Sequence, residues 1–300
     1  MIDTQALRAA YDRDGFVAVE GLLSPDEVAG LKAEAAAIAR GLRGPLIGAE
    51  PRDGASDDEV MADILAIHFP HKTSAIVLDA VKHPRIVEVV TALIGPDVKS
   101  MQTMLFVKRA GKPGQAWHQD EHFIATRDGS LIGAWIALDD ATLENGCLWM
   151  HPGSHRDRVL YPMRPHHDPR FDHSDEMYGF PYAREGGVPV ELKAGGVAFF
   201  DGYVLHRSLD NRAGGGFRRA LVTHYMNARS LLPWATDGRR APVDHRDVVM
   251  VAGEDPYAWK GVEDLMFPYV RADDPEKAKT LFAQLHAEAE RRREARRAAA

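Results

Sequence analysis

The spacing of apolar residues changes character about a third of the way along the chain. Up to residue 97, apolar positions recur mainly every three or four residues, which is the period of a helix with one buried face. The strongest helix start is Ser24-Pro25-Asp26-Glu27, which combines a capping serine, a proline in the first turn and a capping-box glutamate. Helices are therefore predicted over residues 4–12, from Pro25 through Leu42 and over 84–94, with a strand at 15–19 and a loop at 43–58.

After residue 97 the pattern becomes a series of short apolar runs separated by Gly, Pro and Asn-Gly turn signals. Helices first and many short strands afterwards predict a single, mainly β domain, a sandwich or barrel with helices packed on its outside. It divides into a helical N-terminal part (1–97), a β core (98–228) and a C-terminal extension (229–300) with a helix from Asp274. The predicted strands are 100–107, 131–138, 147–150, 188–192, 197–200 and 219–225.

Composition narrows the class of function. The 300 residues carry a formal net charge of -7, which argues against a partner made of duplex nucleic acid. No apolar run approaches the ~18 residues of a membrane span, and the N-terminus has no signal-peptide pattern, so we expect a cytoplasmic protein that acts on a small molecule. The one cysteine, Cys147, excludes an internal disulfide and is interpreted as a small buried residue. The oligomeric state is left open.

Residues 155–187 show no clear period and are rich in His, Pro, Asp and Arg. A loop of this length inside a compact domain is often functional, commonly as a lid. A disordered surface insertion is an equally good interpretation at this point.

The first candidate for chemistry is Trp117-His118-Gln119-Asp120. Residues i and i+2 of a strand point to the same side, so His118 and Asp120 can offer a nitrogen and an oxygen to one metal. A histidine and a carboxylate are two of the three ligands of the facial triad that binds iron(II) and leaves positions open. Alone the signal is weak, because a surface turn of this sequence arises often by chance.

A second candidate group lies 86 residues later. A predicted strand runs into a turn that presents His206, Ser208 follows, and Arg218 opens the next strand. An arginine beside a metal can form a bidentate pair with a carboxylate, as anchoring the distal carboxylate of 2-oxoglutarate requires. The alternative interpretation of His206 is a hydrogen-bonded core histidine, and that of Arg218 is a surface salt bridge. Arg219 competes with Arg218, since strand alternation allows only one of them to face inward.

Together these motifs resemble the phytanoyl-CoA dioxygenase family, which includes phytanoyl-CoA hydroxylase and ectoine hydroxylase. The resemblance covers roughly residues 10–228. Its motifs are Met101-Gln102-Thr103-Met104-Leu105, Trp117-His118-Gln119-Asp120, Glu144 through His155, His206-Arg207-Ser208 and Phe217-Arg218-Arg219-Ala220.

The resemblance implies a double-stranded β-helix, or cupin-like jelly roll, with an oxygenase site in its mouth. It implies that His118, Asp120 and His206 bind Fe(2+), and that Ser208 and Arg218 bind the distal carboxylate of 2-oxoglutarate, with O2 as the other co-substrate. It further implies co-substrate contacts from Gln102, Met104 and Trp135; for Met104 ordinary strand packing is nearly as good an interpretation. The segment Pro152-Gly153-Ser154-His155 is interpreted as a structural turn. The sequence shows no clear counterpart of the lysine that helps to hold 2-oxoglutarate in the acyl-CoA enzyme, which argues against a CoA thioester substrate.

The expected reaction is hydroxylation of an aliphatic C–H with release of succinate and CO2. Halogenases of this superfamily lack the carboxylate ligand. Because Asp120 is present, hydroxylation is favoured. Desaturation, ring formation and epimerisation stay open. Several cationic or polar residues suggest a small polar or anionic substrate, with His122 the best single contact because it is predicted to share a strand face with His118 and Asp120. The other cationic or polar residues that could contact the substrate are His68, His71, Lys72, Arg109 and Arg207.

Two other classes remain. One is a non-catalytic metal-binding jelly-roll module, and the other is a cupin-type metal-dependent isomerase or lyase. The three ligands and the arginine are intact, so nothing in the sequence supports a module that has lost activity, and the cupin-type class would not need Arg218 and Ser208. Iron-dependent binding of 2-oxoglutarate distinguishes both classes from an oxygenase.

Overall fold

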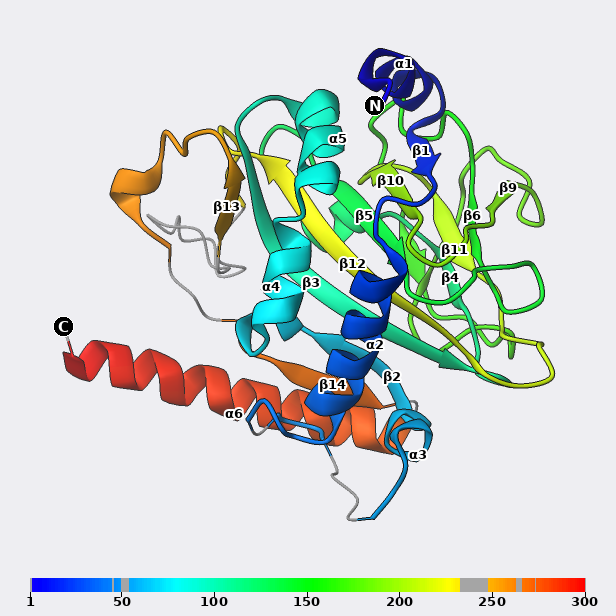
Figure 1. Ribbon diagram of the computed structural model, residues 1–300. Helices are drawn as coiled ribbons and strands as arrows, with labels where there is room; N and C mark the ends of the chain where they lie inside the picture. Colours follow the sequence, from blue (N-terminus) through cyan, green and yellow to red (C-terminus); the bar gives the residue numbers. More distant parts are fainter. Residues whose placement is uncertain are drawn as a thin grey trace.

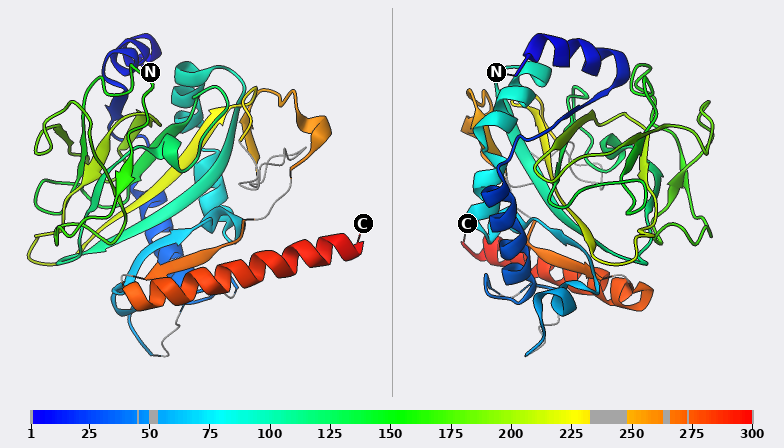
Figure 2. Two further views of the ribbon diagram at one scale, coloured as in Figure 1. Left: turned by 180° about the vertical axis from the view of Figure 1, so that it is seen from behind. Right: turned by 45° about the vertical axis from the view of Figure 1, so that its right-hand side comes forward.

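Two β-sheets face each other and enclose the interior of the molecule, with helices packed outside the larger sheet (Figures 1 and 2). The computed structural model describes residues 2–44, 46–49, 54–232, 248–262, 266–272 and 274–299. This arrangement confirms the predicted class, a mainly β jelly roll with flanking helices.

The larger sheet has eight strands and contains segments from the whole chain. Its order is β1-β10-β5-β12-β3-β2-β14, and β13 also pairs with β3. All pairs in this sheet are antiparallel. The strands are β1 (Phe16–Val19), β2 (Ile64–His68), β3 (Val98–Arg109), β5 (Ile132–Ala137), β10 (Val197–Asp201), β12 (Phe217–Asn227), β13 (Val249–Ala252) and β14 (Tyr269–Ala272).

The smaller sheet has four strands in the order β4-β11-β6-β9. It carries two of the predicted metal ligands, because His118 ends β4 and His206 begins β11, and these two residues are register partners. The strands are β4 (Gln115–His118), β6 (Leu148–Met150), β9 (Val188–Val190) and β11 (His206–Ser208), and a separate hairpin pairs β7 (Met163–Arg164) with β8 (Glu176–Met177).

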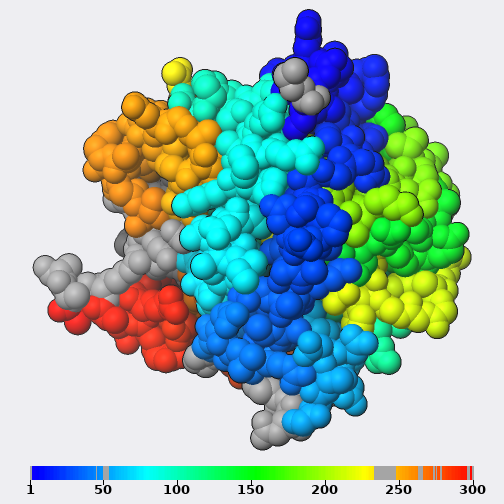
Figure 3. Space-filling view, viewed as in Figure 1, coloured from blue at the N-terminus to red at the C-terminus, as the bar shows by residue number. Residues whose placement is uncertain are grey.

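Helices from the N-terminal part of the chain (residues 1–97) cover the face of the larger sheet that points away from the smaller one (Figures 1 and 3). Apolar side chains from these helices and from the sheet form the main hydrophobic core. In the described part of the chain no helix is both long enough and apolar enough to cross a bilayer. The helices are α1 (Thr4–Asp14), α2 (Pro25–Ala39), α3 (Asp57–Met61), α4 (Ala75–Val81), α5 (Pro84–Ile94) and α6 (Pro275–Ala299), with 3-10 turns η1 (Pro70–Lys72), η2 (Asp120–His122) and η3 (Ala258–Lys260).

The predicted capping box of α2 is confirmed, since the Ser24 hydroxyl accepts from the Glu27 backbone while the Glu27 carboxylate accepts from the Ser24 backbone. The prediction that the helix continues to Leu42 was wrong. The helix ends at Ala39, and Leu42 is 66% exposed. Leu42 matched the helical period by chance, because its side chain is not buried against the rest of the protein.

The sequence pattern also missed β2 and both strands that the structure describes in the C-terminal extension, β13 and β14. β2 is buried along its whole length, so it shows no alternation between apolar and polar positions. β14 pairs with β2, so that the N-terminal part, the β core and the C-terminal extension all contribute to one sheet. The predicted loop at 43–58 contains the start of α3 at Asp57.

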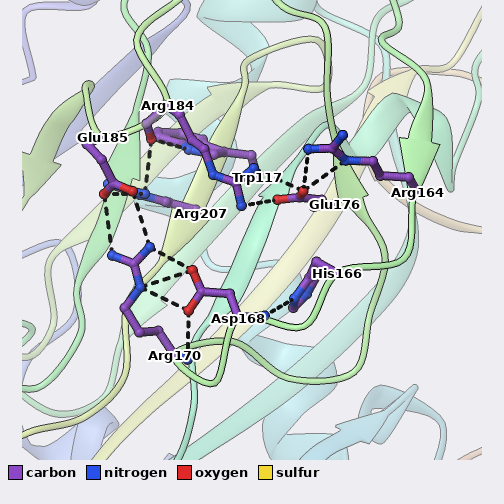
Figure 4. A network of polar contacts seen from close by, with 9 residues as sticks. All are labelled: Trp117, Arg164, His166, Asp168, Arg170, Glu176, Arg184, Glu185 and Arg207. Carbon is purple, nitrogen blue, oxygen red and sulfur yellow. Dashed lines mark hydrogen bonds and ion pairs between the residues drawn. The ribbon is translucent and has the colours of Figure 1, made fainter.

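The segment 155–187 is an ordered layer over the outer side of β4 and β11, not a disordered insertion (Figure 4). Ion pairs run from Arg170 to Asp168 and Glu185, and from Arg184 to Glu176. The buried Arg207 guanidinium joins this network through Glu185 at 3.5 Å and stacks over Trp117. Arg207 therefore ties the segment to β11 on the side opposite the metal ligands.

Candidate active site

The three predicted metal ligands meet at the open end of the smaller sheet. The Nε2 atoms of His118 and His206 lie 3.8 Å and 3.6 Å from Oδ1 of Asp120. One nitrogen or oxygen from each residue falls within 4.8 Å of the others, which suits ligands of one ion. Asp120 is the first residue of η2 and not part of β4, so the predicted shared strand face was wrong for this residue. The turn nevertheless brings its carboxylate back beside both imidazoles.

Backbone carbonyl groups fix the orientation of both imidazoles. Nδ1 of His118 lies 2.8 Å from the Ala116 oxygen, and Nδ1 of His206 lies 3.0 Å from the Val204 oxygen. Because a carbonyl oxygen can only accept, each Nδ1 carries the proton and each Nε2 keeps a lone pair for a metal. Burial and the neighbouring His206 lower the pKa of His118 to about 4, so its ring is neutral at pH 7. Neutral imidazole is the form that binds a metal.

The second oxygen of Asp120 is also held. Nε2 of His224, on β12, lies 2.9 Å from Asp120 Oδ2, so one carboxylate oxygen is occupied and Oδ1 is left for a metal. Burial alone would raise the pKa of Asp120, but the interactions with His206, His224 and His118 outweigh burial and lower it below its usual range. The carboxylate is therefore ionised at pH 7. Two imidazole nitrogens and one carboxylate oxygen form a donor set that fits iron(II).

The segment Pro152 to His155 supports the metal centre as a turn, in agreement with its interpretation from sequence. The Ser154 hydroxyl donates to the His151 carbonyl and accepts from the Leu205 backbone N–H. The turn thus fixes the backbone directly before His206. A second support is Phe200, which packs against the His206 ring at a centroid distance of 4.7 Å. Gly133 leaves room for the Phe200 ring, because a Cβ at this position would lie 2.6 Å from that ring.

The space between the sheets is a cavity of about 790 Å³. Inward-facing residues of β3, β5 and β12 line it in register: Gln102 opposite His224, and Met104 and Trp135 on either side of Val222. The predicted shared face of Gln102 and Met104 is confirmed by this lining. All eight residues predicted for metal and co-substrate contacts line the same cavity: Gln102, Met104, His118, Asp120, Trp135, His206, Ser208 and Arg218.

The choice between Arg218 and Arg219 is decided by strand alternation. Arg218 points into the cavity and is 3% exposed, while Arg219 points outward and pairs with Asp139 at 2.8 Å. In the described part of the chain the Arg218 guanidinium has no carboxylate partner, and its Nε is buried without a hydrogen bond. It packs over the Trp135 ring, and burial lowers its pKa to about 10, so it stays charged at pH 7. A buried, unpaired cation is costly unless an anion joins it.

A second buried basic side chain lies beside Arg218. Lys108 is the register partner of Arg218 across β3 and β12, and burial and the Arg218 charge lower its pKa well below the usual value. Its Nζ donates to the Ser208 hydroxyl at 2.9 Å. The Gln115 backbone N–H donates to the same oxygen at 3.3 Å. Since that oxygen already accepts twice, the Ser208 proton is left to be donated to a further acceptor. Arg218 therefore supplies a positive charge, and Ser208 a directed O–H donor, at one end of the cavity.

His224 and Lys108 are the functional residues that sequence reasoning missed. Both lie on strands already singled out, at even offsets from identified residues. His224 is six residues after Arg218 on β12, and Lys108 is six residues after Gln102 on β3. Counting alternate positions along each strand would have identified both as inward-facing.

The predicted substrate contact His122 lies elsewhere. It ends η2, is exposed, and is not among the residues that line the cavity, so the predicted strand face shared with His118 was wrong. The chain turns at Asp120, and the two-residue period no longer applies. Of the other cationic or polar residues suggested from sequence, the cavity is lined by His68 and not by His71, Lys72, Arg109 or Arg207.

Comparison with known proteins shows the family of the chain. The phytanoyl-CoA dioxygenase (PhyH) family model matches residues 11–220. "Phytanoyl-CoA dioxygenase 1" of Oryza sativa is 38% identical over 113 residues, which are 37% of this chain and 39% of that protein. "Ectoine dioxygenase" of Bordetella parapertussis is 30% identical and aligns with 67% of this chain and 68% of its own. The chain spans between 39% and 50% of the length of several curated relatives that it matches.

A solved structure is similar over most of the chain. It is the non-heme alpha ketoglutarate dependent epimerase SnoN from nogalamycin biosynthesis, with 25% identity and a TM-score of 0.58. The alignment covers 76% of this chain and 85% of SnoN. The matched family residues include all three candidate ligands, Ser208 and Arg218, whereas β13, β14 and α6 lie outside them.

Proposed function

Because this chain belongs to the phytanoyl-CoA dioxygenase family, we propose that it is an iron(II)- and 2-oxoglutarate-dependent oxygenase. His118, Asp120 and His206 would hold the iron. The proposed reaction is hydroxylation of an aliphatic C–H in a small-molecule substrate, with succinate and CO2 as co-products. Iron(II) and 2-oxoglutarate, when bound together, supply the oxidising power by activating O2. The residues of the chain supply binding, orientation and exclusion of water.

The buried Arg218 is the observation that carries this proposal. A metal triad alone would also suit a binding module or a metal-dependent isomerase. Neither of these needs an unpaired guanidinium buried in the same cavity, next to a lysine and a hydroxyl donor. A dicarboxylate needs such a set, because one carboxylate can bind the metal while the other pairs with Arg218 and accepts from Ser208.

Each remaining residue has a proposed part. Lys108 directs the Ser208 hydroxyl towards the distal carboxylate, and His224 holds the Asp120 oxygen that a metal does not use. Gln102 is proposed as a donor to the co-substrate, and Met104 and Trp135 as its apolar walls. These walls keep water away from the charged groups, which strengthens every electrostatic interaction within the site.

Epimerisation is the second candidate reaction, and the likeness to SnoN over 76% of the chain favours it. Both reactions begin with removal of hydrogen from the substrate and consume 2-oxoglutarate. They differ in the product, since hydroxylation adds one oxygen atom to the substrate and epimerisation leaves its mass unchanged.

Succinate formation tests the proposal. The protein would be loaded with iron(II) without oxygen, mixed with 2-oxoglutarate and then exposed to air, with Arg218→Ala as the matched control. We expect slow succinate release from the wild type, even without the primary substrate, and none above background from the variant. Equal rates in the two proteins would contradict the assignment of Arg218.

A further inference from the structure

The cavity has an outer half that the proposed chemistry does not use. We define the inner half as the lining around the metal triad, Arg218 and Ser208, and the outer half as the lining contributed by α6, β14 and the residues next to them. α6 runs alongside β14 at the edge of the larger sheet (Figures 1 and 2). The outer half is lined by Phe69, Phe123, Met266, Phe267, Tyr269, Phe282, Leu285, His286, Ala289, Glu290 and Arg293, among others.

α6 presents one stripe of its surface to this cavity. Phe282, Leu285 and Ala289 follow each other at helical spacing and all line it. The helix is held in place by other residues: Leu281 is buried, and the Arg292 guanidinium lies 4.7 Å from the centre of the Phe267 ring. The apolar stripe is therefore not needed to attach the helix to the domain.

Two aromatic side chains of the outer half are unusually exposed. Phe282 on α6 is 64% exposed, and Phe123, directly after η2, is 50% exposed. They come from segments far apart in the sequence and line the same cavity. Burying an aromatic side chain is worth roughly 1.5–3 kcal/mol, so an apolar molecule that covered these two rings would gain binding energy from both.

The charges of the outer half do not call for an anionic substrate. Arg271 lines the cavity, but the buried Asp172 pairs with it at 2.8 Å and offsets its charge. The remaining charged side chains, Glu290 and Arg293, are exposed on α6 and have opposite signs. The outer half thus differs from the inner half, where two basic side chains, Arg218 and Lys108, are buried together and form no ion pair with an acidic residue of the described chain.

We propose that the outer half binds the apolar body of the primary substrate, and that α6 determines which substrates fit. A cavity of about 790 Å³ is the size that takes a drug-sized ligand. The five carbons of 2-oxoglutarate fill a small part of it. The substrate class is therefore an uncharged or weakly charged molecule with a large apolar body, not the small polar or anionic one expected from sequence. The inference rests on the proposed function for the reaction, but binding of an apolar molecule needs no iron.

The test uses the neutral, apolar dye Nile red, whose fluorescence rises on transfer to an apolar site. It would be titrated into the full-length protein and three variants. Phe282→Ala removes apolar surface from the cavity wall, and Ala289→Trp fills the cavity without removing any. Trp259→Ala is the matched control, because Trp259 is an 83% exposed aromatic residue on η3 that does not line the cavity.

We expect Nile red to bind the wild type and Trp259→Ala equally, and both α6 variants to bind it roughly threefold or more weakly. No binding to the wild type, or wild-type affinity in both α6 variants, would overturn the proposal. The absorbance of the iron and 2-oxoglutarate complex, recorded without oxygen on the same proteins, reports on the inner half. Dye binding without that absorbance would contradict the proposed function alone, and the reverse would contradict this inference alone.

Discussion

The inner and outer halves of the cavity are built in opposite ways. In the inner half the polar groups are buried and oriented: backbone carbonyls hold both histidines, His224 holds Asp120, and Lys108 holds Ser208. In the outer half the lining is mostly apolar and partly exposed; much of it comes from a helix and a strand outside the matched family residues, and Phe69 and Phe123 come from within them. Under the two proposals, this difference means that the chemistry and the choice of substrate reside in separate parts of the chain.

The architecture explains how the two halves can be separate. His118, His206 and Arg218 lie on strands of the two sheets, which fix side chains more precisely than loops do, and Asp120 begins the short turn η2 that follows β4. α6 packs on the sheet edge through β14, so changes on its cavity face need not disturb the sheets. The proposals predict that substitutions in one half leave the other half unaffected.

The largest effect is expected from removing a metal ligand. His206→Ala takes away one of three donors, and we expect iron binding to be lost and succinate formation to fall roughly a thousandfold or more. Metal content after anaerobic loading and the rate of succinate release measure this. Phe282→Ala is the comparison from the outer half and should keep full iron content. A stoichiometric iron content in His206→Ala would remove this residue from the ligand set.

The two neighbouring arginines of β12 give the next largest contrast. Arg218→Ala should weaken 2-oxoglutarate binding by roughly 30-fold or more, because it removes the buried charge that pairs with a carboxylate. Arg219→Ala is matched in sequence and chemistry, but it breaks only the outward ion pair with Asp139. We expect its affinity for 2-oxoglutarate to equal that of the wild type in calorimetry. Similar losses in both variants would mean that the damage is structural.

These two residues also illustrate what the sequence could predict. Motif order and the family resemblance were enough to predict the triad, Ser208 and Arg218, which all line one cavity. Strand alternation predicted only that one of Arg218 and Arg219 faces inward, because it relies on a two-residue period. The period fails where the chain turns, so it placed Asp120 and His122 on a strand that ends at His118. The outer half could not be predicted, because Phe282 resembles any exposed residue of a charged helix until β14 brings α6 to the cavity.

A smaller effect is expected within the inner half from Lys108. We expect Lys108→Met to raise the KM for 2-oxoglutarate about tenfold while kcat changes less, since the residue orients a hydrogen-bond donor and contacts no reacting atom. Ser208→Ala should cost a similar amount. If Lys108 acts through Ser208, the double variant should be little worse than either single variant. Fully additive losses would show that Lys108 acts independently of the hydroxyl.

The smallest effect on both halves is expected from Asp201, which lies outside the cavity lining. Burial raises the pKa of Asp201 to about 6, whereas an unfolded aspartate titrates near 4. The folded state therefore binds the proton more tightly than the unfolded state does. The stabilisation that this proton adds is complete below about pH 4 and is lost as the pH rises through 6. Denaturant unfolding at several pH values measures this dependence.

Asp201→Asn should remove that dependence, which amounts to about 3 kcal/mol between pH 4 and 7. Binding of iron, 2-oxoglutarate and Nile red should stay as in the wild type. An unchanged pH profile of stability would show that the Asp201 carboxyl does not keep its proton on folding.

Iron-dependent binding of 2-oxoglutarate tests the central claim most directly. 2-Oxoglutarate would be titrated without oxygen into iron-loaded and metal-free protein, following the visible charge-transfer absorbance and the heat of binding. We predict that the band appears only when protein, iron and 2-oxoglutarate are together, and that iron tightens 2-oxoglutarate binding. No band, with equal or no binding in both samples, would contradict the account and favour a metal-binding module or a cupin-type isomerase.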